Sequence, residues 1–196
     1  DEWDPPSPFI DCPDVNDVAP NLWNDAGKLV FFFGHLHLDG TFPFQMTTSL
    51  DNGANWSEIY FPKFSGVVGP LTPQPINSTF RDKDGTIFTA LDGLGATSLL
   101  FASRDNGKTW YDTGGRSGGR HTTFELLKNG TILGMGGKHS DINGFMPNSI
   151  SHDQGKTWEI SPTPFPCLGT NQRPTLIRLG SGRLFFASDF QRIDGF

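Results

Sequence analysis

Long hydrophobic runs are missing from this sequence. No stretch approaches the roughly 18 consecutive apolar residues of a membrane span, and the first residues lack the charged start and apolar stretch that mark a signal peptide. Basic residues are also few, 15 against 21 acidic ones, which gives a net charge of −6. A basic stripe for nucleic acid or for an anionic membrane surface is therefore absent. We predict neither a membrane span nor a nucleic-acid partner.

Cysteine is scarce as well, because the chain of 196 residues contains only Cys12 and Cys167. The two thiols would pair in an oxidising compartment, but two lone thiols occur just as readily in reduced proteins. The cysteines therefore leave the compartment and their own state open.

Charged residues make up only 18% of the chain, whereas Gly (24), Pro (15) and Phe (18) are plentiful. This composition is typical of many short strands joined by tight turns. No segment shows the 3.6-residue apolar periodicity of an amphipathic helix. The sequence therefore predicts an all-β protein, and its length suffices for a single domain with its own core.

A pattern of four fixed residues, Ser-x-Asp-x-Gly-x-x-Trp, occurs three times. In a hairpin turn the Asp accepts hydrogen bonds from turn amides, the Gly supplies a positive φ, and the Trp buries a large ring beneath the turn. A turn with an anchor accounts for every fixed position, so the pattern predicts a structural repeat and not by itself a catalytic site. The copies run from Ser49 to Trp56, from Ser103 to Trp110 and from Ser151 to Trp158.

A second pattern, in which two apolar stretches flank a small turn, occurs four times. Its turn glycines are Gly27, Gly85, Gly130 and Gly182, and their spacing of about 50 residues is that of propeller blades. Each unit then reads as four strands, two around the glycine turn and two around the Ser-Asp-Gly-Trp turn.

The fourth copy stops after its second strand. We therefore expect residues 1–196 to form a single, incomplete β-propeller domain of about three and a half blades. The blades are predicted to start near residues 20, 75, 121 and 174, and residues 1–18 to form a linker or a closing strand.

Together the two patterns resemble the BNR/Asp-box repeats of the sialidase (neuraminidase) superfamily. The resemblance implies a six-bladed propeller of four-stranded antiparallel blades, with an arginine just before an innermost strand. Arg120 and Arg173 stand at such positions, each leading to a glycine turn. Sialidases use a tyrosine nucleophile, but Tyr60 and Tyr111 fall on the expected outer strands. A sialidase nucleophile is therefore expected after Phe196.

In an up-and-down blade, the residues before the first strand and those between the second and third strands share one end, which the resemblance identifies as the site. An arginine fork makes two charge-assisted hydrogen bonds with a carboxylate. We therefore expect Arg120 and Arg173 to bind a substrate carboxylate, the alternative for each being a salt bridge between blades. The predicted substrate-binding residues are Arg120, Arg173, Lys138, His35, His37 and Asp189.

The predicted catalytic residues at the same end are His121, His139, Asp141 and Asp92. A histidine there can act as a general acid or base near neutral pH, or it can simply hydrogen-bond a sugar hydroxyl. The aspartates stand where a sialidase-like acid/base would be found, although aspartate is also common in turns. His35 and His37 share one strand face, but no third metal ligand has a diagnostic spacing. No metal or other cofactor is predicted.

The first functional hypothesis is an exo-glycoside hydrolase acting on an acidic glycan, in which a carboxyl or histidine acid protonates the leaving oxygen. The alternatives are a polysaccharide lyase, whose cations neutralise a uronate while His or Tyr removes the C5 proton, and a non-catalytic glycan-binding propeller. An acidic glycan is the expected partner in each case. A secreted or periplasmic location is favoured, and no oligomeric state is predicted.

Overall fold

The computed structural model describes residues 5, 7–11, 17–35, 42–138, 140–167 and 173–188. These residues form strands and turns without a helix, so the described chain contains no helix long and apolar enough to cross a membrane. The all-β class predicted from composition is confirmed.

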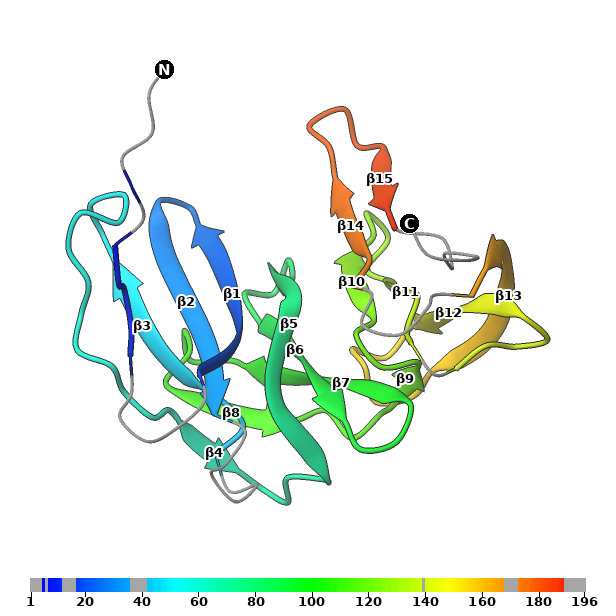
Figure 1. Cartoon of the computed structure of the whole chain (residues 1–196), viewed down its shortest axis with the longest axis horizontal. Helices are drawn as coiled ribbons and strands as arrows, with labels where there is room; N and C mark the ends of the chain where they lie inside the picture. The colour runs from blue at the N-terminus through cyan, green and yellow to red at the C-terminus, as the bar shows by residue number, and fades with distance from the viewer. Residues whose placement is uncertain are drawn as a thin grey trace.

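Three sheets and a hairpin follow one another along the chain (Figure 1), and within each blade the consecutive strands pair antiparallel. They are the blades of a propeller-type fold, as predicted. The first holds β1 (Asp17–Asp25), β2 (Lys28–His35) and β3 (Gln45–Ser49), and the second holds β5 (Leu71–Arg81), β6 (Ile87–Gly93), β7 (Thr97–Ser103) and β8 (Thr109–Asp112). The third holds β10 (Thr123–Leu126), β11 (Ile132–Met135), β12 (Phe145–Ser151) and β13 (Glu159–Pro166), and the hairpin holds β14 (Thr175–Arg178) and β15 (Leu184–Ala187).

The first blade differs from its expected form. In place of the fourth strand expected after the first Ser-Asp-Gly-Trp turn, Tyr60 makes a single backbone bridge with Met46. Pro62 then interrupts the ladder because it has no N–H to donate. The chain continues as β4 (Lys63–Ser65), which pairs in parallel with β8 on the outer side of the second blade, while the short β9 (Ser117–Gly118) pairs with β7.

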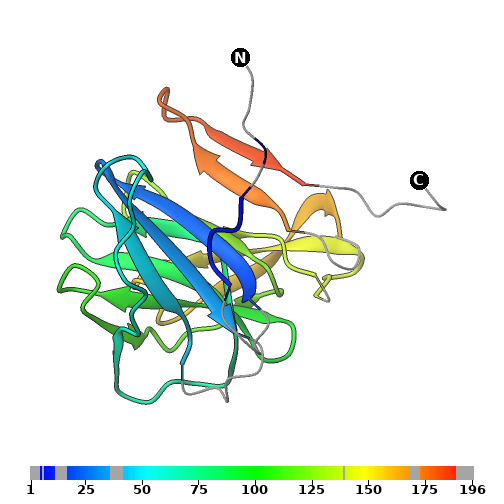
Figure 2. The ribbon, with the colours of Figure 1, turned by 60° about the vertical axis from the view of Figure 1, so that its left-hand side comes forward.

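The innermost strands β1, β5, β10 and β14 contact one another in that order, and Figure 2 shows the hairpin of β14 and β15 beside the third blade. Polar side chains join these strands. Asn21 Nδ2 donates to Thr79 Oγ1 at 2.6 Å, and Ser78 Oγ lies 3.4 Å from Thr123 Oγ1. Thr123 Oγ1 in turn accepts the backbone N–H of Leu176 at 3.0 Å. Hydrogen bonds therefore join the innermost strands of all four blades to one another.

The repeated turns have the predicted construction, which is clearest in the second copy. Ser103 Oγ donates to Asp105 at 2.9 Å and accepts the Gly107 N–H at 2.8 Å. Asp105 also accepts the Thr109 N–H at 2.8 Å, and Trp110 Nε1 donates to the Gly107 carbonyl at 2.9 Å. The first and third copies repeat the bonds among Ser, Asp and Gly.

The tryptophans of these turns anchor one blade to the blade before it. Trp110 is fully buried, and its ring lies 5.3 Å from Phe44 and 5.9 Å from Phe32 of the first blade. Trp158 packs in the same way against the core between the second and third blades. Trp56 is only half-buried, and its ring contacts Phe9, which precedes the first blade, and Phe31 of β2.

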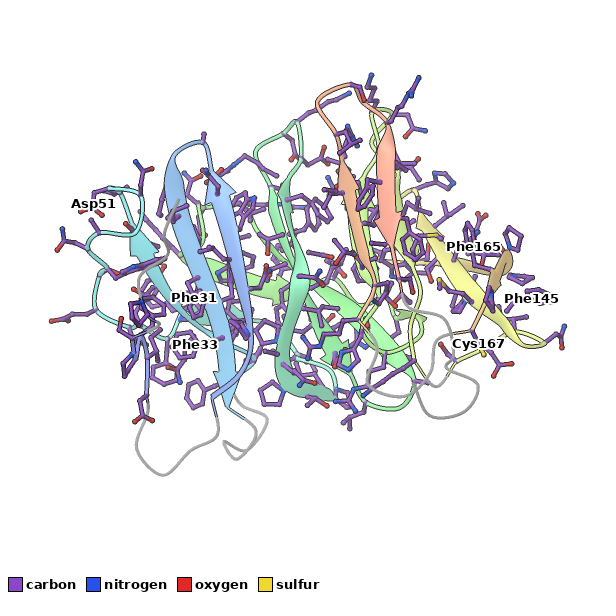
Figure 3. The ribbon with its side chains drawn as sticks, turned by 45° about the horizontal axis from the view of Figure 1, so that its top comes forward. Phe31, Phe33, Asp51, Phe145, Phe165 and Cys167 are labelled. Atoms are coloured by element: carbon purple, nitrogen blue, oxygen red, sulfur yellow. The ribbon has the colours of Figure 1, made fainter. Side chains whose placement is uncertain are left out.

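The outer strand β13 carries prolines at alternating positions, Pro162, Pro164 and Pro166. Opposite residues of an antiparallel pair exchange both backbone hydrogen bonds or neither. Pro162 stands opposite Pro147, and neither has an N–H, so the missing donor of Pro162 faces away from β12. Figure 3 shows Phe145 and Phe165 at this end of the molecule, with Cys167 just beyond β13. Cys12 lies outside the described residues, so its pairing stays open.

Replacing Trp110 with alanine should lower the free energy of unfolding by about 3–5 kcal/mol, because a fully buried ring leaves a cavity at the seam of two blades. The half-buried Trp56 provides the matched control, and Trp56→Ala should cost less. Urea unfolding of the two variants measures the difference. A loss below about 1 kcal/mol for Trp110→Ala would contradict the proposed anchoring.

The turn carboxylates should make stability depend on acid. Hydrogen bonds from Asn55 lower the pKa of Asp51 to about 2, and those from Thr157 lower the pKa of Asp153 to about 2. Each carboxylate has a lower pKa in the folded protein than the 3.8 of the unfolded chain. Its contribution to stability is therefore full above pH 3.8 and is lost as the pH falls toward 2. Acid titration of unfolding should therefore show a smaller loss for Asp153→Asn than for the wild type; an identical loss would refute this origin.

Candidate functional site

The site begins where two loops of the third blade meet. Arg120 precedes β10 and Lys138 follows β11, and their backbones form a bridge in which the Lys138 N–H donates to the Arg120 carbonyl at 2.7 Å. The backbones of the preceding residues, Gly119 and Gly137, are in direct contact. A Cβ added to Gly137 would lie only 2.1 Å from Gly119 Cα, so there is no room for a side chain. Both also have φ in the left-handed region. Glycine at these two positions therefore brings the two cationic residues together.

The second blade contributes Asp92, near the end of β6. Its side chain is fully buried. Oδ1 accepts the backbone N–H of His121 at 2.9 Å, and Oδ2 lies 3.0 Å from both Arg120 Nε and His121 Nδ1. Burial alone would raise the pKa of Asp92, but the interactions with His121 and Arg120 outweigh it and hold that pKa below its ordinary value. Asp92 is therefore ionised at neutral pH.

His121 is buried and has a φ of +62°, in the left-handed region that few non-glycine residues adopt. Burial lowers the pKa of its imidazole, Asp92 raises it, and the charges of Arg173 and Lys138 lower it again. The net result is a pKa below the ordinary 6.5. The ring is therefore mainly neutral at pH 7.

Arg120 forms the salt bridge between blades that was the alternative to substrate binding. Besides its bond to Asp92, its Nη2 donates to Gln74 Oε1 of β5 at 2.9 Å. The edge of the guanidinium formed by Nε and Nη2 is thus occupied, which leaves the two N–H groups of Nη1 and the second N–H of Nη2 for a ligand. Sequence reasoning missed Gln74, because nothing in its surroundings in the sequence indicates a partner 46 residues away.

Arg173 stands just before β14, at the position equivalent to Arg120, but it is exposed. Within the described ranges its side chain makes neither a hydrogen bond nor an ion pair. Partial desolvation lowers the pKa of its guanidinium, while the charge of Asp92 acts in the opposite direction. Its full donor fork is therefore available to a ligand.

Lys138 completes the cluster and is buried. Burial and the charge of Arg120 lower the pKa of its ammonium group, and Arg173 adds to this effect while Asp92 opposes it. Among the described residues, three cations from two blades therefore surround one carboxylate. The charge of this described cluster is positive although the chain as a whole carries −6.

The remaining predicted residues lie apart or outside the described chain. Asp141 is exposed and caps a turn, because its Oδ1 accepts the Gly144 N–H at 2.7 Å. His37, His139 and Asp189 lie outside the described residues, as does the side chain of His35. Within the residues that are described, no three His, Cys, Asp or Glu side chains gather where they could hold a metal ion.

Removing the charge of Arg173 should raise the pKa of His121, because that charge opposes protonation of the ring. NMR titration of the imidazole in Arg173→Ala measures the shift. Arg183→Ala removes an exposed arginine at the opposite end of the same hairpin and serves as the control. An unchanged or lower His121 pKa in Arg173→Ala would show that the two groups do not interact.

Comparison with known proteins supports this description. A family model for the BNR/Asp-box repeat matches residues 149–159, which contain the third of the repeated turns. Among curated proteins, none matches the chain by sequence.

Solved structures share its fold. A protein of unknown function from Dyadobacter fermentans DSM 18053 aligns with a TM-score of 0.62 and 14% identity, over 88% of this chain and 57% of that one. A Trypanosoma rangeli sialidase in complex with sialic acid aligns with a TM-score of 0.58 and 16% identity, over 88% of this chain and 33% of that one. A PL25 ulvan lyase bound to -[GlcA(1-4)Rha3S]- aligns with a TM-score of 0.56 and 14% identity, over 90% of this chain and 48% of that one.

The chain thus spans between 33% and 57% of the length of these structures. Identity at this level is informative about the fold. As the two sequence patterns predicted, the chain carries a BNR/Asp-box repeat and has the propeller-type fold of these solved structures.

Proposed function

We propose that Arg120, His121, Lys138 and Arg173 bind the carboxylate of an acidic glycan, in a carbohydrate-active enzyme. The observation that carries the proposal is the surplus of positive charge at this cluster. In the part of the chain that the structure describes, three cations share Asp92, whose two oxygens already contact His121 and Arg120.

Without a bound anion, this surplus of positive charge is energetically unfavourable. Burial of a cation beside other cations disfavours its charged form, as the lowered pKa of Lys138 records. A carboxylate entering the cluster would remove this repulsion and would meet the unoccupied fork of Arg173, which matches carboxylate geometry. The site is therefore suited to a substrate that carries its own negative charge.

The structural neighbours support an acidic sugar. The sialidase is in complex with sialic acid, and the lyase is bound to a ligand that contains GlcA, a uronic acid. Both ligands carry a carboxylate on the sugar ring. Because the identities are 16% and 14%, the neighbours support the class of ligand and leave the reaction to the chemistry of the site.

Glycoside hydrolysis remains the first reaction to consider, because the sequence resemblance and the sialidase neighbours favour it. It requires an acid that protonates the leaving oxygen. Asp92 is fully buried and is not presented to a sugar, whereas Asp141 is exposed and has one oxygen engaged in a turn. In this reading, the nucleophile comes from residues outside the described ranges.

Elimination from a uronate is the second reaction, and the neutral His121 beside Asp92 favours it. The imidazole would take the C5 proton, and the C–H electron pair would form the C4–C5 double bond. The C4–O bond would break with its electrons moving to the departing oxygen, which takes a proton from water. The cations would stabilise the charge that develops on the carboxylate.

Incubating the intact protein with uronate-containing and sialic-acid-containing glycans separates these reactions. An unsaturated, ultraviolet-absorbing product indicates elimination, and released sugar without such absorbance indicates hydrolysis. Binding without turnover would overturn the enzymatic part of the proposal. Failure to bind any acidic glycan would overturn the proposal as a whole.

Arg173→Ala should weaken the binding of an acidic glycan by roughly 10- to 100-fold, since a hydrogen bond to a charged group contributes about 1.5–3 kcal/mol. Binding of a neutral glycan should change much less. Calorimetry on Arg173→Ala and on the control Arg183→Ala measures both effects. Equal affinities of the two variants for the acidic glycan would count against a role for Arg173.

A further inference from the structure

We infer that Asp92 is a positioning residue, which holds the ring of His121 with its proton on Nδ1 so that Nε2 is the atom that exchanges a proton with the substrate. The second half of this statement rests on the proposed function, because a glycan at the cluster is what Nε2 would act on. The inference gives Asp92 a different role from that of a catalytic acid or base, which the sequence predicted.

The burial of Asp92 is the first step of the argument. Its side chain is fully buried, its two oxygens accept hydrogen bonds from the backbone N–H of His121 and from Nε of Arg120, and Oδ2 lies 3.0 Å from Nδ1 of His121. A carboxylate in this state has no oxygen to offer a sugar. Its contacts instead fix the two residues that lie between it and the loop surface.

The backbone around His121 is held from the same side. The His121 N–H donates to Asp92 of β6, and the next N–H, that of Thr122, donates to Ser98 Oγ of β7 at 3.1 Å. Asp92 and Ser98 are register partners, so two adjacent strands accept hydrogen bonds from consecutive residues of the loop. These hydrogen bonds maintain the left-handed φ of His121, which would otherwise be disfavoured.

The tautomer follows from the chemistry of the pair. An ionised carboxylate only accepts hydrogen bonds, whereas a neutral imidazole has one N–H and one lone pair. Oδ2 of Asp92 lies 3.0 Å from Nδ1, in a charge contact that is not aligned as a hydrogen bond. The negative charge of that oxygen favours a proton on Nδ1, which leaves the lone pair on Nε2. In the described part of the chain, no residue forms a hydrogen bond with Nε2.

The charges around the ring suit a base. Arg173 and Lys138 disfavour the imidazolium, and Asp92 favours it. Arg120 is bonded to the same oxygen of Asp92 that faces the ring. The ring is thus neutral before it takes a proton, and the imidazolium that forms has a carboxylate beside it.

Asp92→Asn tests the inference directly. An asparagine has one acceptor oxygen and one NH₂ group, so it cannot serve both Nδ1–H and the backbone N–H of His121. With the NH₂ group facing Nδ1, the proton should move to Nε2. Nitrogen NMR of ¹⁵N-histidine-labelled protein should show Nδ1–H in the wild type and a shift toward Nε2–H in the variant.

The variant should also separate turnover from binding. Loss of the Nε2 lone pair should lower turnover by about 100-fold or more, whereas affinity for an acidic glycan should be retained or increased because a negative charge is removed. Asp112→Asn is the matched control. Asp112 is a buried carboxylate of the same blade, bonded to Arg116 at 2.7 Å, and its replacement should leave the tautomer of His121 unchanged.

The outcomes distinguish this inference from the proposed function. An Nε2–H tautomer in the wild-type protein overturns the inference even if Asp92→Asn fails to fold, and it leaves glycan binding intact. A tautomer that is the same in the wild type and in Asp92→Asn also overturns it. If no acidic glycan binds while the tautomer shifts as expected, the proposed function fails and the positioning by Asp92 is supported.

Discussion

The buried carboxylate of Asp92 lies on the seam between the second and third blades, and both the seam and the site depend on it. It is the only anion among the described residues that contacts Arg120 and His121. Its negative charge offsets the repulsion among Arg120, Lys138 and Arg173, because each of these cations interacts with it. The loop before β10 would also lose the acceptor that holds its left-handed residue. One side chain therefore links the packing of two blades to the electrostatics of the cluster.

Much of the fold could be predicted because it is encoded locally. The bonds within a Ser-Asp-Gly-Trp turn join residues no more than four positions apart, such as Ser103 and Gly107. A reader of the sequence sees all the partners of such a turn at once. The glycine turns and their flanking strands are equally local, and so the order of strands in each blade followed from the sequence.

What could not be predicted depends on contacts between blades. Arg120 and Arg173 occupy equivalent positions, yet the first is bonded to Gln74 and Asp92 and the second is exposed. Trp110 and Trp56 likewise share a motif and differ in burial, since a neighbouring blade covers the first. The parallel pairing of β4 with β8 is of the same kind. In each case the deciding partner comes from another repeat, and the motif does not encode it.

The prolines of β13 have a consequence for the behaviour of the protein in concentrated solution. An exposed edge strand ordinarily offers a row of N–H groups on which a strand of another molecule can grow. The rim of the second blade is covered by β4, and the rim of the third has lost donors at alternating positions. Two successive blades therefore resist edge-to-edge aggregation by different means, one by occupying the edge and the other by removing its donors.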